Sequence, residues 1–162
     1  KVDLDKIAPT EWLESENKYQ WGKVHDENAY YLGGVSGHAG LFSNLKDMKR
    51  FVQMLLKEGL NEDGDRIFSQ AILRASHNNY TKGLNHHRGL GWQLVDEVNS
   101  PAGYLLSKQS YGHTGFTGTS IWIDPDRKIG MILLTNRVHI SRDIDMNRIR
   151  RIFHNLAVMA LD

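Results

Sequence analysis

The sequence predicts an α+β fold in which helices pack on the faces of an antiparallel β-sheet. Residues 129–135 are apolar at almost every position, so a strand there has two faces to bury and needs helices on both. The turn-prone residues 124–128, with Pro125 near their start, join this strand to another apolar run as an antiparallel hairpin. Two further segments, residues 45–56 and 145–160, carry apolar side chains at helical spacing.

Residues 1–44 follow neither a helical nor a strand period, because Pro9 and several glycines interrupt them. A stretch of this length inside a compact domain is usually functional. We therefore expect an ordered loop region that lines a cleft. His25 and His38 belong to it, either as groups that reach the cleft or as hydrogen-bonded organisers of the loop.

Residues 45–88 form the expected helical part. Ser43 or Asn44 can cap its first helix, and Gly59 ends that helix. Ser69 caps a second, short helix through residues 71–73, and a polar loop covers residues 77–87. The apolar stripe of the first helix comprises Leu45, Met48, Val52, Leu55 and Leu56, with Phe51 at its edge.

Residues 89–162 form the expected sheet and the last helix. The strands are predicted at residues 89–95, 107–113, 119–124 and 129–135. The last helix begins at Asp143 or Asp145, and Arg148, Arg150 and Arg151 are expected on its solvated face. Its buried stripe should comprise Ile149, Ile152, Phe153, Leu156 and Ala160. This helix covers one face of the sheet; no obvious cover for the other face is evident, because the two earlier helices are short.

Composition describes an ordinary globular protein: 162 residues, of which 40% are apolar and 24% charged, with a net charge of +1. This length fits a single domain. Without a basic patch, nucleic acid is not an expected partner, and no apolar run is long enough to span a membrane. The absence of cysteine excludes disulfides and thiolate chemistry. Because the chain begins with Lys1 rather than Met, we expect a processed product or a piece of a longer protein.

The most informative stretch is Tyr111-Gly112-His113-Thr114-Gly115-Phe116-Thr117-Gly118-Thr119-Ser120, which runs into the strand-like residues 121–123. Glycines on both sides of a His-Thr pair pack poorly, but they let another molecule approach the backbone closely. The stretch suits an exposed strand edge that presents N–H groups and side chains to a substrate. The alternative is a glycine-rich bend with a surface histidine.

His113-Thr114-Gly115, followed by residues 118–125, resembles the third motif of serine β-lactamases and penicillin-binding proteins, commonly Lys-Thr-Gly. Their class C-like branch, with its esterases and peptidases, often has His at the first position. Residues 33–43 resemble the small-residue loop of that branch, and residues 133–139 resemble its final strand. The resemblance runs in order from about Ile7 to the end of the chain, and it implies a β-lactamase/transpeptidase-like fold of which this chain is the C-terminal part.

The family also needs a Ser-x-x-Lys nucleophile and a Tyr-x-Asn or Ser-x-Asn loop. Tyr-x-Asn does not occur here, and Ser-x-x-Lys occurs only at Ser15/Lys18 and Ser43/Lys46. Lys46 lies on a polar helix face beside Asp47, which favours its protonated form, so the Ser43 pair is better interpreted as a helix cap. We therefore expect the upstream N-terminal half of the same protein to supply the nucleophile Ser and Lys, and the isolated chain to be inactive.

In the assembled site, the resemblance implies acyl-enzyme chemistry on an amide or ester: a β-lactam, a peptidoglycan-type peptide or a small ester. His113, Thr114 and Gly115 would form the catalytic strand, and the backbone N–H of Phe116 would donate to the oxyanion. The implied substrate-binding residues are Thr117, Asn136, Arg142, His25 and His38. For Arg142, a surface ion pair is the alternative.

No metal or other cofactor is expected, because no His-x-x-x-His spacing appears and His86 and His87 are adjacent in a polar loop. Two other functions stay open. The chain could be a non-catalytic binding or regulatory domain that keeps the fold, or a self-contained enzyme that uses Ser43. The resemblance suggests a bacterial protein and is compatible with a place outside the cytoplasm.

Overall fold

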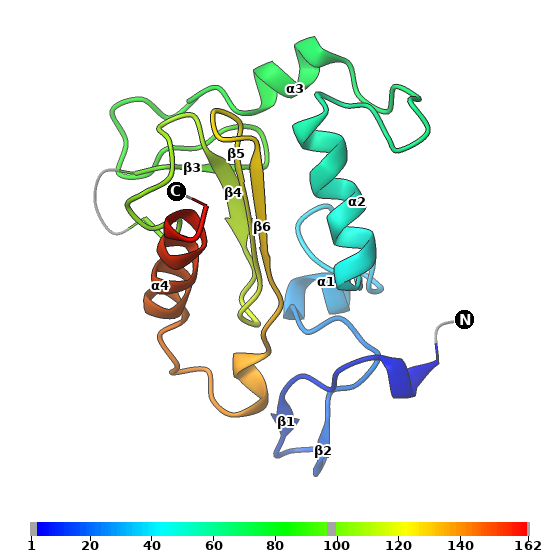
Figure 1. Cartoon of the computed structure of the whole chain (residues 1–162). Helices are drawn as coiled ribbons and strands as arrows, with labels where there is room; N and C mark the ends of the chain where they lie inside the picture. The colour runs from blue at the N-terminus through cyan, green and yellow to red at the C-terminus, as the bar shows by residue number, and fades with distance from the viewer. Residues whose placement is uncertain (1–2, 97–99, 162) are drawn as a thin grey trace. The chain divides into compact units, whose positions relative to one another are not determined.

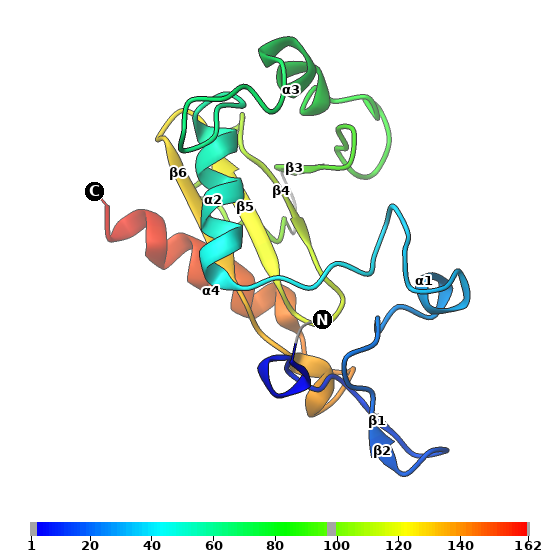
Figure 2. The ribbon, with the colours of Figure 1, turned by 90° about the vertical axis from the view of Figure 1, so that its right-hand side faces the viewer.

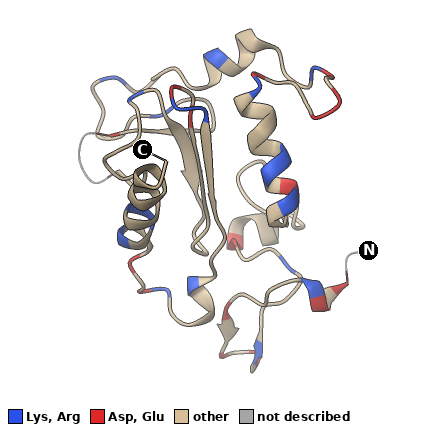
Figure 3. Ribbon diagram, viewed as in Figure 1, with Lys and Arg blue, Asp and Glu red and all other residues tan. Residues whose placement is uncertain are grey.

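The computed structural model describes residues 3–96 and 100–161. The chain forms two compact units, which are described separately (Figure 1). One comprises Lys1–Ser43, Phe116–Gly118 and Thr135–Ile144, and the other comprises Asn44–Gly115, Thr119–Leu134 and Asp145–Asp162. Basic and acidic residues are interspersed along the ribbon of both units (Figure 3).

The larger unit contains a four-stranded antiparallel sheet of order β3-β4-β5-β6. Its strands are β3 (Gln93–Leu94), β4 (Tyr111–Thr114), β5 (Ser120–Asp124) and β6 (Ile129–Leu133). The register pairs Trp122 with Met131 and Asp124 with Ile129, so the predicted hairpin is confirmed. The first two strands are shorter than predicted, because residues 89–92 and 107–110 form turns.

Helix α2 (Leu45–Leu56) packs against β5 and β6 on one face of the sheet (Figures 1 and 2). Its Met54 and Leu55 join a buried cluster with Tyr111 and Ile123. Contact with the strands is close: a Cβ on Gly130 would lie 2.0 Å from Cγ1 of Val52. The expectation that this face lacks a cover is therefore wrong, because a helix of three turns suffices where glycine lets it approach.

Helix α4 (Met146–Met159) covers the opposite face, where Trp122, Met131 and Val158 belong to a second buried cluster. The face of the helix that is buried differs from the predicted one. Its buried residues are Met146, Arg150, His154 and Val158. Of the predicted stripe, Ile149, Ile152, Leu156 and Ala160 are exposed, and only Phe153 packs against the cluster. Two polar side chains take inward positions because each finds hydrogen-bond partners there.

Helix ends follow the predicted capping chemistry in part. Asn44, not Ser43, caps α2, since its side-chain oxygen accepts the N–H of Asp47 at 3.0 Å. After this helix Gly59 adopts a φ of +94°, as expected of a residue that ends it. Ser69 caps α3 (Gln70–Ser76), as predicted. None of the helices in the described ranges is both long and apolar enough to cross a membrane.

The smaller unit is mostly irregular, as expected, but it holds short elements that the sequence did not predict. They are η1 (Leu4–Lys6), the two-stranded hairpin β1 (Trp12–Leu13) and β2 (Lys18–Tyr19), α1 (Glu27–Tyr31) and η2 (Arg137–His139). Asp26 caps α1 by accepting the N–H of Ala29 at 2.8 Å.

Candidate active site

The His-Thr-Gly motif lies at the end of β4, where His113 is opposite Ile121 and Thr114 is opposite Ser120 of β5. Strand β3 pairs with β4 only at Tyr111 and Gly112. The His113 side chain is exposed, and its Nδ1 lies 2.9 Å from the Thr114 carbonyl oxygen. Because a carbonyl only accepts, Nδ1 carries the hydrogen and Nε2 remains available to a ligand. The Thr114 hydroxyl accepts from Nε2 of Gln93 at 3.4 Å, so it keeps its own hydrogen for donation.

The backbone after this motif is held by Arg150, a residue that the sequence analysis placed in solvent. Arg150 is only 5% exposed, and its Nη2 donates to the carbonyl oxygens of Gly115 at 2.7 Å and Thr119 at 3.0 Å. The solvated interpretation is wrong for this arginine. Its place in the row of Met146, His154 and Val158, at four-residue spacing, is the signal that could have found it.

In the smaller unit, the ring of Phe116 lies among cationic and aromatic side chains. His25 stacks on it with ring centroids 5.8 Å apart, and the guanidinium of Arg137 lies 4.6 Å from its centroid. Arg137 Nε also donates to the Phe116 carbonyl, and its backbone N–H donates to the Thr117 carbonyl, both at 2.8 Å. Arg137 was not among the predicted site residues.

Glu11 connects the groups around Phe116. Its carboxylate accepts two hydrogen bonds from Arg142, at 2.6 Å each, and lies 2.9 Å from Nε2 of His25. Hydrogen bonds from Arg142, and then from His25, lower the pKa of Glu11, so its carboxylate stays charged. Arg142 also pairs with Glu27 at 3.0 Å, and the two carboxylates raise its own pKa further. Arg142 thus forms an ion pair, which was the predicted alternative to binding a substrate.

The remaining predicted residues make local hydrogen bonds in the same unit. Asn136 Nδ2 donates to the Pro9 carbonyl at 2.7 Å, while its buried Oδ1 has no partner among the described residues. His38 lies between Asp26 Oδ1, at 2.9 Å from its Nε2, and the Ser36 hydroxyl, at 2.6 Å from its Nδ1. His38 therefore links the glycine-rich loop that contains it to Asp26, the residue that caps α1.

Neither Ser-x-x-Lys pair has the environment of an activated serine. Lys18 forms an ion pair with Glu16 at 2.6 Å, and this contact raises the pKa of the lysine, whereas a base for serine needs a neutral amine. Ser43 and Lys46 are both exposed, so nothing desolvates that lysine. Within the described ranges, no three His, Cys, Asp or Glu side chains gather in the way that a metal ion requires.

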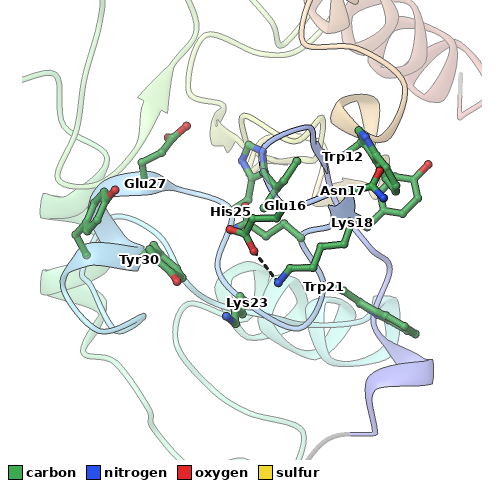
Figure 4. Close-up of a pocket in the computed structure, with 13 residues that line it drawn as sticks. Trp12, Glu16, Asn17, Lys18, Trp21, Lys23, His25, Glu27 and Tyr30 are labelled. Atoms are coloured by element: carbon green, nitrogen blue, oxygen red, sulfur yellow. Dashed lines mark ion pairs between the residues drawn. The ribbon is translucent and has the colours of Figure 1, made fainter.

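A cavity of about 620 Å³ lies wholly within the smaller unit, beside the β1–β2 hairpin and α1 (Figure 4). Its walls are rich in aromatic rings, from Trp12, Tyr19, Trp21, Tyr30 and Tyr31. His25 also lines it, and that imidazole contacts Phe116 by stacking. The cavity therefore adjoins the arrangement that holds Phe116.

Comparison with known proteins assigns the chain to a family. The family model described as Beta-lactamase matches residues 5–154. A protein of Salmonella gallinarum, provisionally named D-alanyl-D-alanine carboxypeptidase, is 42% identical over 126 residues, which are 74% of this chain and 28% of that protein. A protein of Escherichia coli O157:H7 with the same provisional name is 41% identical over 122 residues, which are 74% of this chain and 27% of that protein. The chain thus spans little more than a quarter of the length of these relatives.

Among solved structures, a β-lactamase from Mycobacterium bovis superposes with a TM-score of 0.59 and 22% identity, over 75% of this chain and 45% of that one. At this identity the superposition speaks for the fold alone. The family model covers nearly the whole chain, in agreement with the order of motifs around β4. The chain therefore belongs to the β-lactamase family.

Proposed function

We propose that this chain is the C-terminal part of a serine hydrolase that cleaves an amide through an acyl-enzyme, with a peptide ending in D-alanyl-D-alanine as its substrate. Membership of the β-lactamase family supports serine acyl-transfer chemistry. The provisional name of its relatives supports the peptide over a β-lactam or a small ester. The nucleophilic serine and its lysine would come from a segment of the protein upstream of this chain.

The observation that carries the proposal is the Gly115–Phe116 peptide group. Its carbonyl oxygen accepts from the buried Arg150, and in the described part of the chain its N–H donates to no protein acceptor. Because a peptide group is planar and trans, fixing the carbonyl also fixes the direction of the N–H on the opposite side. A preorganised, unoccupied N–H after the His-Thr-Gly strand is what an oxyanion hole requires.

Arg150 acts on this donor in a second way. A guanidinium bound to the carbonyl oxygen draws electron density toward the oxygen, and the N–H of the same peptide group becomes more positive. The developing oxyanion of a tetrahedral intermediate would therefore meet a strengthened donor. In the proposed enzyme, Arg150 is a positioning residue, since it acts through the peptide group and not on the substrate.

The two side chains at the end of β4, His113 and Thr114, supply binding groups. Thr114 has its hydroxyl hydrogen free and would donate to the carboxylate or a carbonyl of the substrate. His113 presents Nε2, which donates to a carboxylate only when the imidazole is protonated. For Arg142, engagement by two glutamates favours a role in holding Phe116 over direct contact with a substrate carboxylate.

The test compares the full-length protein with this chain alone, using a fluorescent penicillin and a peptide ending in D-alanyl-D-alanine. We expect acylation and release of D-alanine from the full-length protein and neither from the chain. Acylation of the isolated chain at any serine, Ser43 included, would contradict the division of the site between two segments. A full-length protein that is folded but never acylated would instead favour the non-catalytic binding domain.

A further inference from the structure

We propose that the aromatic cavity of the smaller unit binds a neutral, N-acetylated sugar chain. The rings that line it are exposed although they are large and apolar: Trp12 is 38% exposed and Trp21 is 42% exposed. Exposed aromatic groups that gather around one cavity mark a binding surface. The cavity volume of about 620 Å³ lies within the range of small-molecule sites, roughly 300–1,000 Å³.

The rings are held in place by contacts within the unit. Tyr19 packs edge-on against Trp12, with ring centroids 5.0 Å apart, and stacks on His139 at 4.5 Å. Trp21 anchors its polar edge by donating from Nε1 to the Ile7 carbonyl at 2.6 Å, which leaves the ring itself to line the cavity. Flat faces that are fixed before binding lose little conformational entropy when a ligand stacks on them.

The charges of the cavity exclude two other ligand classes. It is lined by two lysines and two glutamates, so the formal charge of these four groups sums to zero. Lys18 forms an ion pair with Glu16 at 2.6 Å, which a dashed line marks in Figure 4, and Glu27 forms one with Arg142. A nucleotide needs an excess of positive charge around its phosphate groups, which the lining of this cavity lacks. A purely apolar ligand would leave these charges desolvated without partners.

A sugar ring suits both the aromatic and the polar side chains that line the cavity. Its C–H face packs on an aromatic ring, while its hydroxyl and acetamido groups hydrogen-bond to amides such as those of Asn17 and Gln20, which also line the cavity. Gln20 donates to the Val24 carbonyl, which leaves its own carbonyl oxygen as an acceptor. The glycan of a cell-wall substrate carries such sugars next to its peptide. The inference that the sugar belongs to a cell-wall glycan rests on the proposed function, whereas the inference that the cavity binds a sugar does not.

The experiment titrates the full-length protein with an N-acetylglucosamine tetramer, which carries no peptide and no lactam, and follows tryptophan fluorescence. We expect saturable binding that Trp21→Ala and Tyr30→Ala each weaken at least about tenfold, as loss of one stacking platform predicts. Trp21→Phe keeps a ring and should retain most of the affinity. Tyr104→Ala removes an exposed tyrosine of the other unit, 64% exposed, and should change nothing.

Absence of saturable binding, equal binding by the Trp21→Ala protein, or tighter binding of adenosine monophosphate than of the tetramer would each overturn the inference. Circular dichroism confirms that each variant is folded. Acylation by a fluorescent penicillin, measured on the same samples, separates the two proposals. A protein that is acylated but binds no tetramer refutes only the sugar site, and a protein that binds the tetramer but is never acylated refutes only the hydrolase.

Discussion

Acidification should destabilise the larger unit through a single buried imidazole, that of His154. The side chain is fully buried. Nδ1 lies 3.0 Å from the Pro101 carbonyl, so it carries the hydrogen, and Nε2 accepts from the Ser120 hydroxyl at 3.3 Å. The neutral ring is thus satisfied. Burial, and to a lesser extent the positive charge of Arg150, lowers the pKa of His154 from 6.5 to about 4.

The sign follows from proton linkage. In the unfolded chain the imidazole takes up its proton as the pH falls below about 6.5, whereas in the folded protein it resists protonation until the pH nears 4. The stabilisation is therefore complete above pH 6.5 and is lost as the pH falls from there through 4. With about 1.4 kcal/mol for each pKa unit, the whole loss is about 3 kcal/mol, and most of it has gone by pH 4.5.

Urea unfolding between pH 8 and 4.5 measures this loss, and the indole of Trp122 is a local reporter, because its ring centroid lies 6.3 Å from that of His154. The free energy of unfolding of the wild type should fall about 2–3 kcal/mol more than that of His154→Gln, which keeps a donor and an acceptor but does not titrate. Carboxylates titrate in both proteins and cancel in the difference. Parallel profiles for wild type and His154→Gln would refute the reasoning.

Three further outcomes are expected. In the proposed hydrolase, Arg150→Lys should lower kcat about tenfold with KM nearly unchanged, because a lysine is shorter and lacks the second nitrogen that donates to Asn147 while Nη2 donates to both carbonyls; an equal loss in KM would indicate a binding role instead. Glu11→Gln should also lower kcat about tenfold, while Glu62→Gln, in an exposed ion pair, should not; equal rates in steady-state assays would contradict the role of Glu11. Gly130→Ala should lower the free energy of unfolding by about 1–3 kcal/mol, because its Cβ would lie 2.0 Å from a valine methyl of α2, whereas Gly37→Ala meets nothing within 4 Å and should be neutral in urea unfolding.

The hairpin of β5 and β6 and the position of α2 could be predicted because their signals are local. Pro125 lies next to Asp124, and the stripe that α2 buries, including Val52 and Leu55, repeats within one segment. The face of α4 could not be predicted by the same rule. The rule assumes that apolar side chains point inward, whereas Arg150 and His154 take inward positions because carbonyl and hydroxyl partners elsewhere in the chain satisfy them.

In the candidate site, too, features with local sequence signals could be predicted, and features that depend on distant partners could not. The end of β4 was predicted from adjacent residues, because His113, Thr114 and the glycines form one short motif. The residues that hold this backbone were missed, because they bind it across large sequence separations: 35 residues between Arg150 and Gly115, and 21 between Arg137 and Phe116. The four-residue spacing of Arg150 with Met146, His154 and Val158 indicates an inward side chain, but it does not indicate which carbonyl that side chain binds.

The two arginines that the sequence did not reveal hold successive peptide groups. Arg150 binds the carbonyl of Gly115, and Arg137 binds the carbonyl of Phe116, so the planes on both sides of the Phe116 Cα are fixed. In the proposed oxyanion hole, these hydrogen bonds would set the direction of the Phe116 N–H before a substrate binds. A donor of this kind needs no reorganisation when negative charge develops on an oxygen, which is the condition under which such a hydrogen bond lowers a barrier most. The glycines of the motif let the chain turn at this point, and the arginines decide where the turn presents its N–H.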